Sequence, residues 1–129
     1  MRTLRVGIAS YEQMKARTVV IARGEYRPAA DEPKVWFTSA ESFARVLSDR
    51  NRALLGIIAE STPESLARLA ELSGRKKSNL SRTLKTMERY GFVHLSRGAR
   101  GSVIPRVPYQ RITLTLALST PRREGAEAA

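Results

Sequence analysis

The chain has 129 residues, a formal net charge of +11, no cysteine and a single histidine, His94. This length fits one compact domain with short appendages, and the composition excludes disulfides, thiolate catalysis, zinc fingers and a multi-histidine metal site within one chain. No apolar run approaches the roughly 20 residues that span a bilayer, and the N-terminus lacks the long apolar segment of a signal peptide. We therefore expect a cytoplasmic protein without a membrane anchor.

The first part of the sequence predicts a strand, a helix and a linker. Residues 4–8 alternate between apolar side chains and arginine or glycine, which is the period of a strand with one buried face. Ser10 and Gln13 have the spacing of a capping box, so we expect a helix that begins there and runs to Gly24. Residues 28–33 are a linker by composition.

The middle of the sequence predicts a short strand at residues 34–38, followed by helices. We expect Ser39 and Asp49 to cap the first two helices, and Thr62 to cap the third, with Pro63 at its first helical position. The expected buried stripes of these three helices are, in order, Phe43, Val46 and Leu47, then Leu54, Leu55 and Ile58, then Leu66, Leu69 and Ala70.

Gly74 is placed to end the third helix in a left-handed conformation. A fourth helix then buries Leu80, Leu84 and Met87 and ends near Gly91. Its position directly after a short turn makes these two helices a helix-turn-helix pair.

The last part of the sequence predicts a β-hairpin and a final strand. Residues 92–95 and 103–104 flank a tip bounded by glycine, residues 98–101. Residues 112–118 alternate between apolar and small or polar side chains, as a half-buried strand does. We expect the tail from Thr120 onward to be disordered.

Positive charge is concentrated in one segment. Between Gly74 and Arg111, ten Lys or Arg residues stand against one acidic residue, Glu88, which gives +9, whereas the other 91 residues carry 13 basic and 11 acidic groups. A solvated helix face normally mixes the two signs. The concentration therefore indicates a polyanionic partner.

On a helical wheel, the basic side chains of the fourth helix lie opposite its apolar stripe. Arginine can fork onto guanine and asparagine can pair with adenine, while lysine and serine can hold phosphates. The candidate DNA-binding residues are Ser78, Asn79, Ser81 and Arg82 at base edges, Lys85 and Arg89 at phosphates, Arg75, Lys76 and Lys77 at the turn into the helix, and Arg97 and Arg100 at the hairpin tip, in the minor groove or on its phosphates.

These elements predict an α+β fold, a winged helix-turn-helix core with short N-terminal and C-terminal strands. The expected organisation is an N-terminal strand-helix appendage and linker (1–33), the winged helix-turn-helix DNA-binding domain (34–111), a C-terminal strand for dimerisation (112–119) and the disordered tail (120–129). The two terminal strands could pair with each other within one chain, across two chains, or both.

Residues 66–97 resemble the winged-helix core of MarR-like regulators, through Ser78-Asn79-Leu80-Ser81-Arg82, then Leu84 and Met87, then Tyr90-Gly91-Phe92-Val93. Outside that core, the N-terminal strand-helix, EPKVWFTSAESFARVLSDRNRALLGIIAES and VPYQRITLTLAL resemble small prokaryotic winged-helix regulators that are often antitoxins paired with toxin genes. This resemblance implies a DNA-binding repressor that also holds a small toxin protein. The long dimerisation helices of full MarR proteins are missing, which argues against their type of ligand sensing.

We thus expect a sequence-specific regulator of transcription, a repressor that binds double-stranded DNA as a homodimer, with one helix in the major groove. No enzymatic activity, metal or cofactor is expected, because the acidic residues are scattered over helix surfaces without a paired pattern. Two alternatives remain open. The first is an antitoxin that neutralises a toxin and regulates its own operon, and the second is a duplex RNA-binding protein, for which the basic segment holds few aromatic residues.

Overall fold

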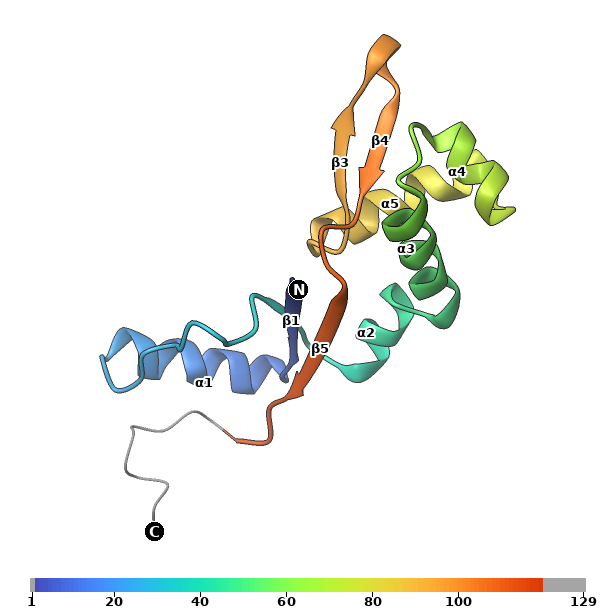
Figure 1. Ribbon diagram of the computed structural model, residues 1–129. Coiled ribbons are helices and arrows are strands. Elements are labelled where there is room, and N and C mark those ends of the chain that lie inside the picture. Colours follow the sequence, from blue (N-terminus) through green and yellow to red (C-terminus); the bar gives the residue numbers. More distant parts are fainter. Residues whose placement is uncertain (1, 120–129) are drawn as a thin grey trace. The chain divides into compact units, whose positions relative to one another are not determined.

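The computed structural model describes residues 2–119 and has a mixed α and β architecture (Figure 1). The described residues form two compact units, which we call the helical unit (residues 2–3 and 44–111) and the sheet unit (residues 4–43 and 112–119). The tail expected to be disordered, from Thr120, lies outside the described residues. In chain order the elements are β1 (Thr3–Ile8), α1 (Tyr11–Ala22), β2 (Val35–Phe37), α2 (Ala40–Val46), α3 (Asp49–Ser61), α4 (Leu66–Ser73), α5 (Lys77–Arg89), β3 (His94–Arg97), a 3-10 turn (Ala99–Gly101), β4 (Val103–Arg106) and β5 (Arg111–Leu116).

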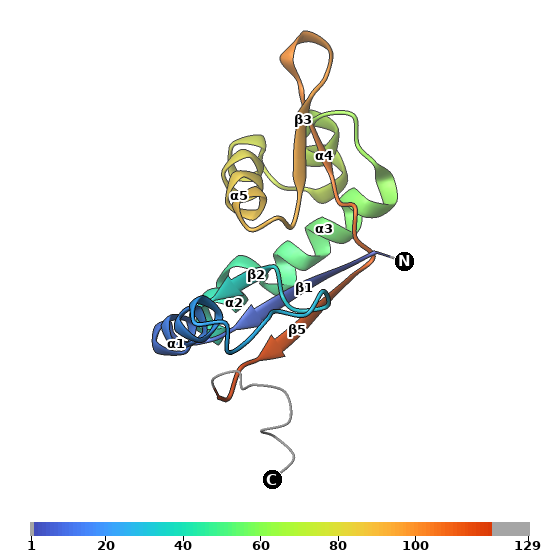
Figure 2. The same ribbon diagram turned by 90° about the vertical axis from the view of Figure 1, so that its left-hand side faces the viewer.

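The sheet unit is built on three strands in the order β2-β1-β5 (Figure 2). β1 and β2 are parallel, with Val6 opposite Val35, and α1 is the connection between them. At the end of β5, the Ala117 N–H donates to the Ile8 carbonyl oxygen at 2.9 Å. The two terminal strands therefore pair with each other within one chain, and β1, with a neighbour on each side, is the central strand.

The predicted capping box of α1 is confirmed. The Gln13 N–H donates to Ser10 Oγ at 3.1 Å, and the Ser10 N–H donates to Gln13 Oε1 at 2.8 Å. On one side of the sheet, the ring of Trp36 lies directly against Gly7, where a Cβ would come within 2.5 Å of the ring. The guanidinium of Arg17 stacks over the same ring at 5.2 Å and pairs with Glu32. These contacts tie α1, its following loop and β2 together.

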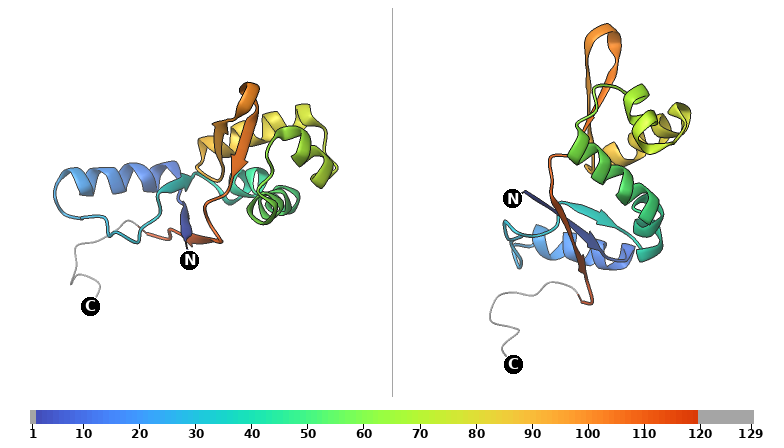
Figure 3. Two further views of the ribbon diagram at one scale, coloured as in Figure 1. Left: turned by 45° about the horizontal axis from the view of Figure 1, so that its top comes forward. Right: turned by 45° about the vertical axis from the view of Figure 1, so that its right-hand side comes forward.

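Most of the apolar stripes expected from the sequence are buried in the core of the helical unit. The stripe expected for α2 is an exception, because Leu47 is buried but Phe43 and Val46 are only half-buried. Ala70, expected in the stripe of α4, is only half-buried. β3 and β4 form the antiparallel hairpin, with His94 opposite Arg106 and Arg97 opposite Val103, and its tip projects beyond the helices of this unit (Figure 3). The buried side chains of this unit include Leu54, Leu55 and Ile58 of α3, Leu66 and Leu69 of α4, Leu80, Leu84 and Met87 of α5, and Phe92 and Val93 after α5.

Two of the predicted helix caps are wrong. α3 is capped by Ser48, whose Oγ accepts from the Asn51 N–H, and Asp49 is its first helical residue. Thr62 cannot cap α4, because an N-cap needs extended backbone and Thr62 is left-handed, with φ 42° and ψ 59°, as the C-cap of α3. Ser65 is extended and caps α4, so Pro63 stands in the connection and not at the first helical position.

The division of the chain also differs from the predicted one. The predicted DNA-binding domain, residues 34–111, includes β2, yet this strand pairs with β1 and belongs to the sheet unit. The reason is that the backbone groups of a three-residue strand are satisfied by a neighbouring strand, and the neighbour is β1, about 30 residues earlier in the chain. The C-terminal strand likewise completes this sheet.

Candidate nucleic-acid interface

The two units differ strongly in charge. The described residues of the helical unit carry 15 Lys or Arg against five Asp or Glu, a net charge of +10. Those of the sheet unit carry six basic and five acidic residues, a net charge of +1. An electrostatic site for a polyanion therefore belongs to the helical unit.

Within that unit, α5 presents a cationic stripe to solvent. Its inner side is fully buried, and Arg82, Lys85 and Arg89 on the other side are exposed. None of these three takes part in a salt bridge with the described residues 2–119. Lys76, Lys77 and Ser78 at the start of the helix are also exposed, and Ser81 is half-buried. We call Arg82, Lys85 and Arg89 the α5 stripe.

Arg75 lies apart from this stripe, in a hydrogen-bond cluster on the flank of α5. Its Nε and Nη2 atoms donate to Asn79 Oδ1 at 2.9 and 2.7 Å, Nη2 also donates to Thr83 Oγ1 at 3.1 Å, and Nη1 donates to Asn51 Oδ1 at 3.0 Å. Asn51 belongs to α3 and is held in turn, since its Nδ2 donates to the Val46 carbonyl oxygen at 2.9 Å. Arg75 thus joins α3 to α5 across the connection between α4 and α5.

These four hydrogen bonds argue against the role expected for Arg75, a contact with DNA at the turn into the helix. Four of the five N–H donors of a guanidinium are occupied, so little remains for a phosphate. Burial, with a smaller contribution from the positive charge of Arg50, lowers the pKa of Arg75 below its ordinary value. The structure places Arg75 and Asn79 together in this cluster, whereas the other candidates on α5 stand outside it.

Two further candidate residues lie at the hairpin tip. Arg97 and Arg100 are both exposed. Arg100 is left-handed, with φ 57° and ψ 27°, an uncommon conformation for a residue with a long side chain, and it precedes the left-handed Gly101. Arg97 Nη1 donates to the Gly101 carbonyl oxygen at 3.1 Å, which fixes the tip. Arg106, by contrast, makes a structural contact, because its Nη1 donates to the Pro63 carbonyl oxygen at 2.7 Å.

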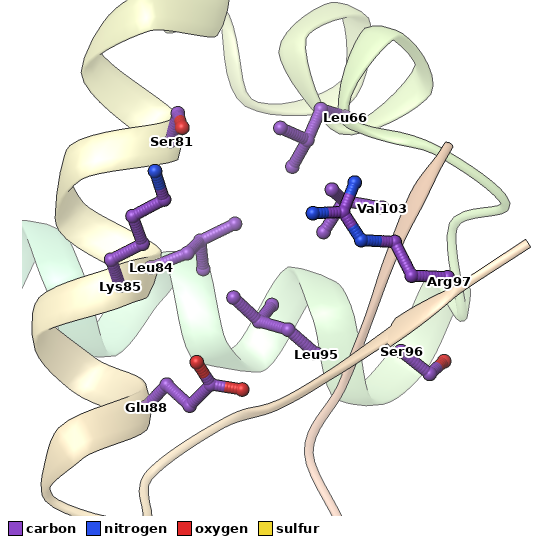
Figure 4. Close-up of a pocket in the computed structure, with 9 residues that line it drawn as sticks. All are labelled: Leu66, Ser81, Leu84, Lys85, Glu88, Leu95, Ser96, Arg97 and Val103. Carbon is purple, nitrogen blue, oxygen red and sulfur yellow. The ribbon is translucent and has the colours of Figure 1, made fainter. Parts of the chain in front are cut away.

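A groove of about 190 Å³ lies between α5 and the hairpin (Figure 4). Lys85 and Glu88 stand on its α5 side and Arg97 on its β3 side. Its apolar lining consists of Leu66, Leu84, Leu95 and Val103. The α5 stripe and the hairpin therefore each contribute a cation to one groove, Lys85 and Arg97, and the acidic Glu88 lies in the same lining.

Sequence reasoning missed Asn51 and Thr83, the partners that hold Arg75. Asn51 stands 24 residues before Arg75, and no local pattern connects the two. Thr83 stands eight residues after Arg75, beyond one helical turn. Elsewhere in residues 2–119, no three His, Cys, Asp or Glu side chains come together as metal ligands, and no helix in that range is long and apolar enough to cross a membrane.

A family model described as HVO_A0114 matches residues 46–114, which is more than half of the chain. The protein belongs to the HVO_A0114 family. The matched span covers α3, α4, α5 and the hairpin, the elements that form the core of the helical unit. No curated protein and no solved structure matches the chain.

Proposed function

We propose that the helical unit is a winged helix-turn-helix domain and that the protein is a sequence-specific regulator of transcription that binds double-stranded DNA. The observation that carries this proposal is the α5 stripe, three exposed cations without acidic partners on a helix whose other side is the core. A helix of this kind fits the major groove, which admits an α-helix and displays base edges to it. The resemblance to MarR-like regulators supports a repressor.

In this proposal α5 lies in the major groove and the β3–β4 hairpin is the wing. Arg82, in the N-terminal half of α5, contacts a base edge, with Ser78 and Ser81 beside it. Lys85 and Arg89 contact phosphates, and Lys76 and Lys77 contact the backbone at the turn. Arg100 at the wing tip enters the minor groove or rests on its phosphates, and Arg97 lies on the groove wall between wing and helix.

Binding should depend strongly on salt. The exposed candidate cations are Lys76, Lys77, Arg82, Lys85, Arg89, Arg97 and Arg100. If most of them contact phosphates, raising the salt from about 50 to about 200 mM lowers the affinity roughly 1,000-fold or more, because condensed counterions are released on binding.

The test compares Arg82→Ala with Arg100→Ala on a pool of random DNA duplexes. We expect Arg82→Ala to cost about 1–3 kcal/mol and to relax the base preference at one position. Arg100→Ala should weaken binding evenly across sequences and reduce the salt slope by about one. An Arg82→Ala protein with unchanged affinity and preference would show that Arg82 does not read a base. A wild-type protein that prefers duplex RNA to duplex DNA would overturn the choice of nucleic acid.

We further propose that two copies associate through β5. β1 is covered on both edges, β2 is only three residues long, and β5 leaves one edge without a neighbouring strand among residues 2–119. Edge strands normally carry charges or proline. β5 has a charge only at its first residue, Arg111, residues 112–119 contain neither charge nor proline, and Leu114 and Leu116 are 45% and 58% exposed. Two such strands paired about a two-fold axis cover each other's leucines, and a two-fold dimer reads a pseudo-palindromic operator.

Sedimentation of Leu116→Lys tests this interface. The charge should convert the dimer to a monomer, because it would be buried against its own copy, and operator binding should weaken with it. Leu72→Lys is the matched control, since Leu72 is an exposed leucine on α4, 37% exposed, and belongs to the helical unit. A Leu116→Lys protein that remains dimeric excludes β5 as the interface. A wild-type monomer that becomes paired only with a small toxin protein would favour the antitoxin alternative for the same strand.

A further inference from the structure

Asn79 was expected to pair with adenine, which requires both ends of its carboxamide. An adenine pair uses Oδ1 as acceptor for the N6 amino group and Nδ2 as donor to N7. In the structure, Asn79 Oδ1 already accepts two N–H groups of Arg75, at 2.9 and 2.7 Å. The acceptor end is therefore directed into the cluster and away from a base.

The orientation of the carboxamide follows from chemistry as well as from geometry. A guanidinium has donors and no acceptor, so Arg75 can bond only the oxygen end of Asn79, and a flipped amide would set N–H groups against N–H groups. Arg75 is itself fixed by Asn51 and Thr83. No buried side-chain nitrogen or oxygen of the described residues lacks a partner. The Asn79 NH2 group, which bonds no group in residues 2–119, therefore still reaches solvent.

We infer that Arg75 is a specificity-determining positioning residue, which holds Asn79 so that its carboxamide can only donate to a base. This inference rests on the proposed function, since it assumes that α5 lies in the major groove. A lone donor matches the acceptors of guanine or thymine and the N7 of adenine, and it rejects cytosine, which offers a donor there. The position contacted by Asn79 is thus read as "not cytosine", without selection of adenine.

Arg75→Met tests the inference, because methionine keeps an apolar stem and has no donors. Released from Arg75, the Asn79 carboxamide can turn and pair bidentately, so the selection of duplexes from a random pool should shift toward adenine at one position, by roughly tenfold. Arg75→Lys is the conservative control: lysine also has donors only, so it keeps Oδ1 turned inward and retains the wild-type preference. In Arg75→Met/Asn79→Ala the shift to adenine should vanish.

Other outcomes overturn the inference. An Arg75→Met protein that binds all sequences more weakly, with a salt slope reduced by about one as in Arg100→Ala, would identify Arg75 as a phosphate contact. A preference that is unchanged in Arg75→Met would show that Arg75 does not restrict Asn79.

A second measurement needs no substitution. Wild-type protein labelled with ¹⁵N and ¹³C should show a scalar coupling across the hydrogen bond from Arg75 Nε to the Asn79 carboxamide, and its absence would refute the inference even if Arg75→Met does not fold. If this coupling is present but no duplex is bound under any salt condition, the proposed function fails while the cluster stands. The two failures are therefore distinguishable.

Discussion

The helical unit and the sheet unit differ in net charge and in the apolar side chains that they leave exposed. The helical unit has a net charge of +10 and encloses its apolar stripes between α3, α4 and α5. The sheet unit is nearly neutral and leaves Leu114 and Leu116 exposed on an edge strand. A face on which cations far outnumber acids fits a polyanion, whereas an edge strand with exposed leucines fits another polypeptide. This difference supports our proposal that the two units have separate roles, one in binding DNA and the other in assembly.

Reversing charges in one unit at a time should have the largest effect on duplex affinity. In Arg82→Glu/Lys85→Glu, two carboxylates would face the phosphates, and we expect duplex affinity to fall by at least about 100-fold. The matched control is Lys15→Glu/Arg23→Glu, which reverses two exposed charges at α1 and its C-cap in the sheet unit. This control should bind as the wild type does in a fluorescence anisotropy titration at constant salt. Equal losses in the two variants would mean that only the total charge matters.

A smaller effect is expected from a methyl group added to the sheet unit. In Gly7→Ala the new Cβ would come within 2.5 Å of the Trp36 ring, so β1 or the ring must shift, at a cost of about 1–3 kcal/mol. Trp36 is the single tryptophan of the chain, and its fluorescence therefore reports unfolding of this unit. The urea midpoint of the fluorescence change should fall. An unchanged midpoint would show that Trp36 does not pack on Gly7 in solution.

A glycine-to-alanine substitution in the helical unit should instead stabilise the protein, and this is the smallest of the expected effects. Gly56 is exposed within α3, has no positive φ, and has no heavy atom within 4 Å of the position of an added Cβ. Gly56→Ala should therefore stabilise the protein by up to about 1 kcal/mol, because alanine loses less backbone entropy in a helix. Circular dichroism during thermal unfolding measures this gain, and duplex affinity should not change. A loss of stability would indicate that the exposed side of α3 is covered by another surface.

The sequence predicted those features that depend on neighbours within about one helical turn. The capping box of α1, the buried stripe of α5 and the left-handed Gly74 at the end of α4 are all present as expected. Even between adjacent residues, however, the sequence alone did not decide which one is the N-cap. Ser48 and Asp49 are both good N-cap residues, and only the point at which the backbone turns helical decides that Ser48 is the cap. Thr62 is likewise a C-cap and not an N-cap because α3 extends as far as Ser61.

By itself, the sequence determined that a basic segment lies on and after a helix with one apolar side, because charge and periodicity are properties of adjacent residues. Only the tertiary structure decided the partners of β5, of β2 and of Arg75. It pairs β5 with β1, about 100 residues apart, it brings β2 into the same sheet, and it commits Arg75 to Asn51 across 24 residues. Backbone edges and side-chain donors accept any suitable partner that folding brings near, and no local pattern records which partner that is.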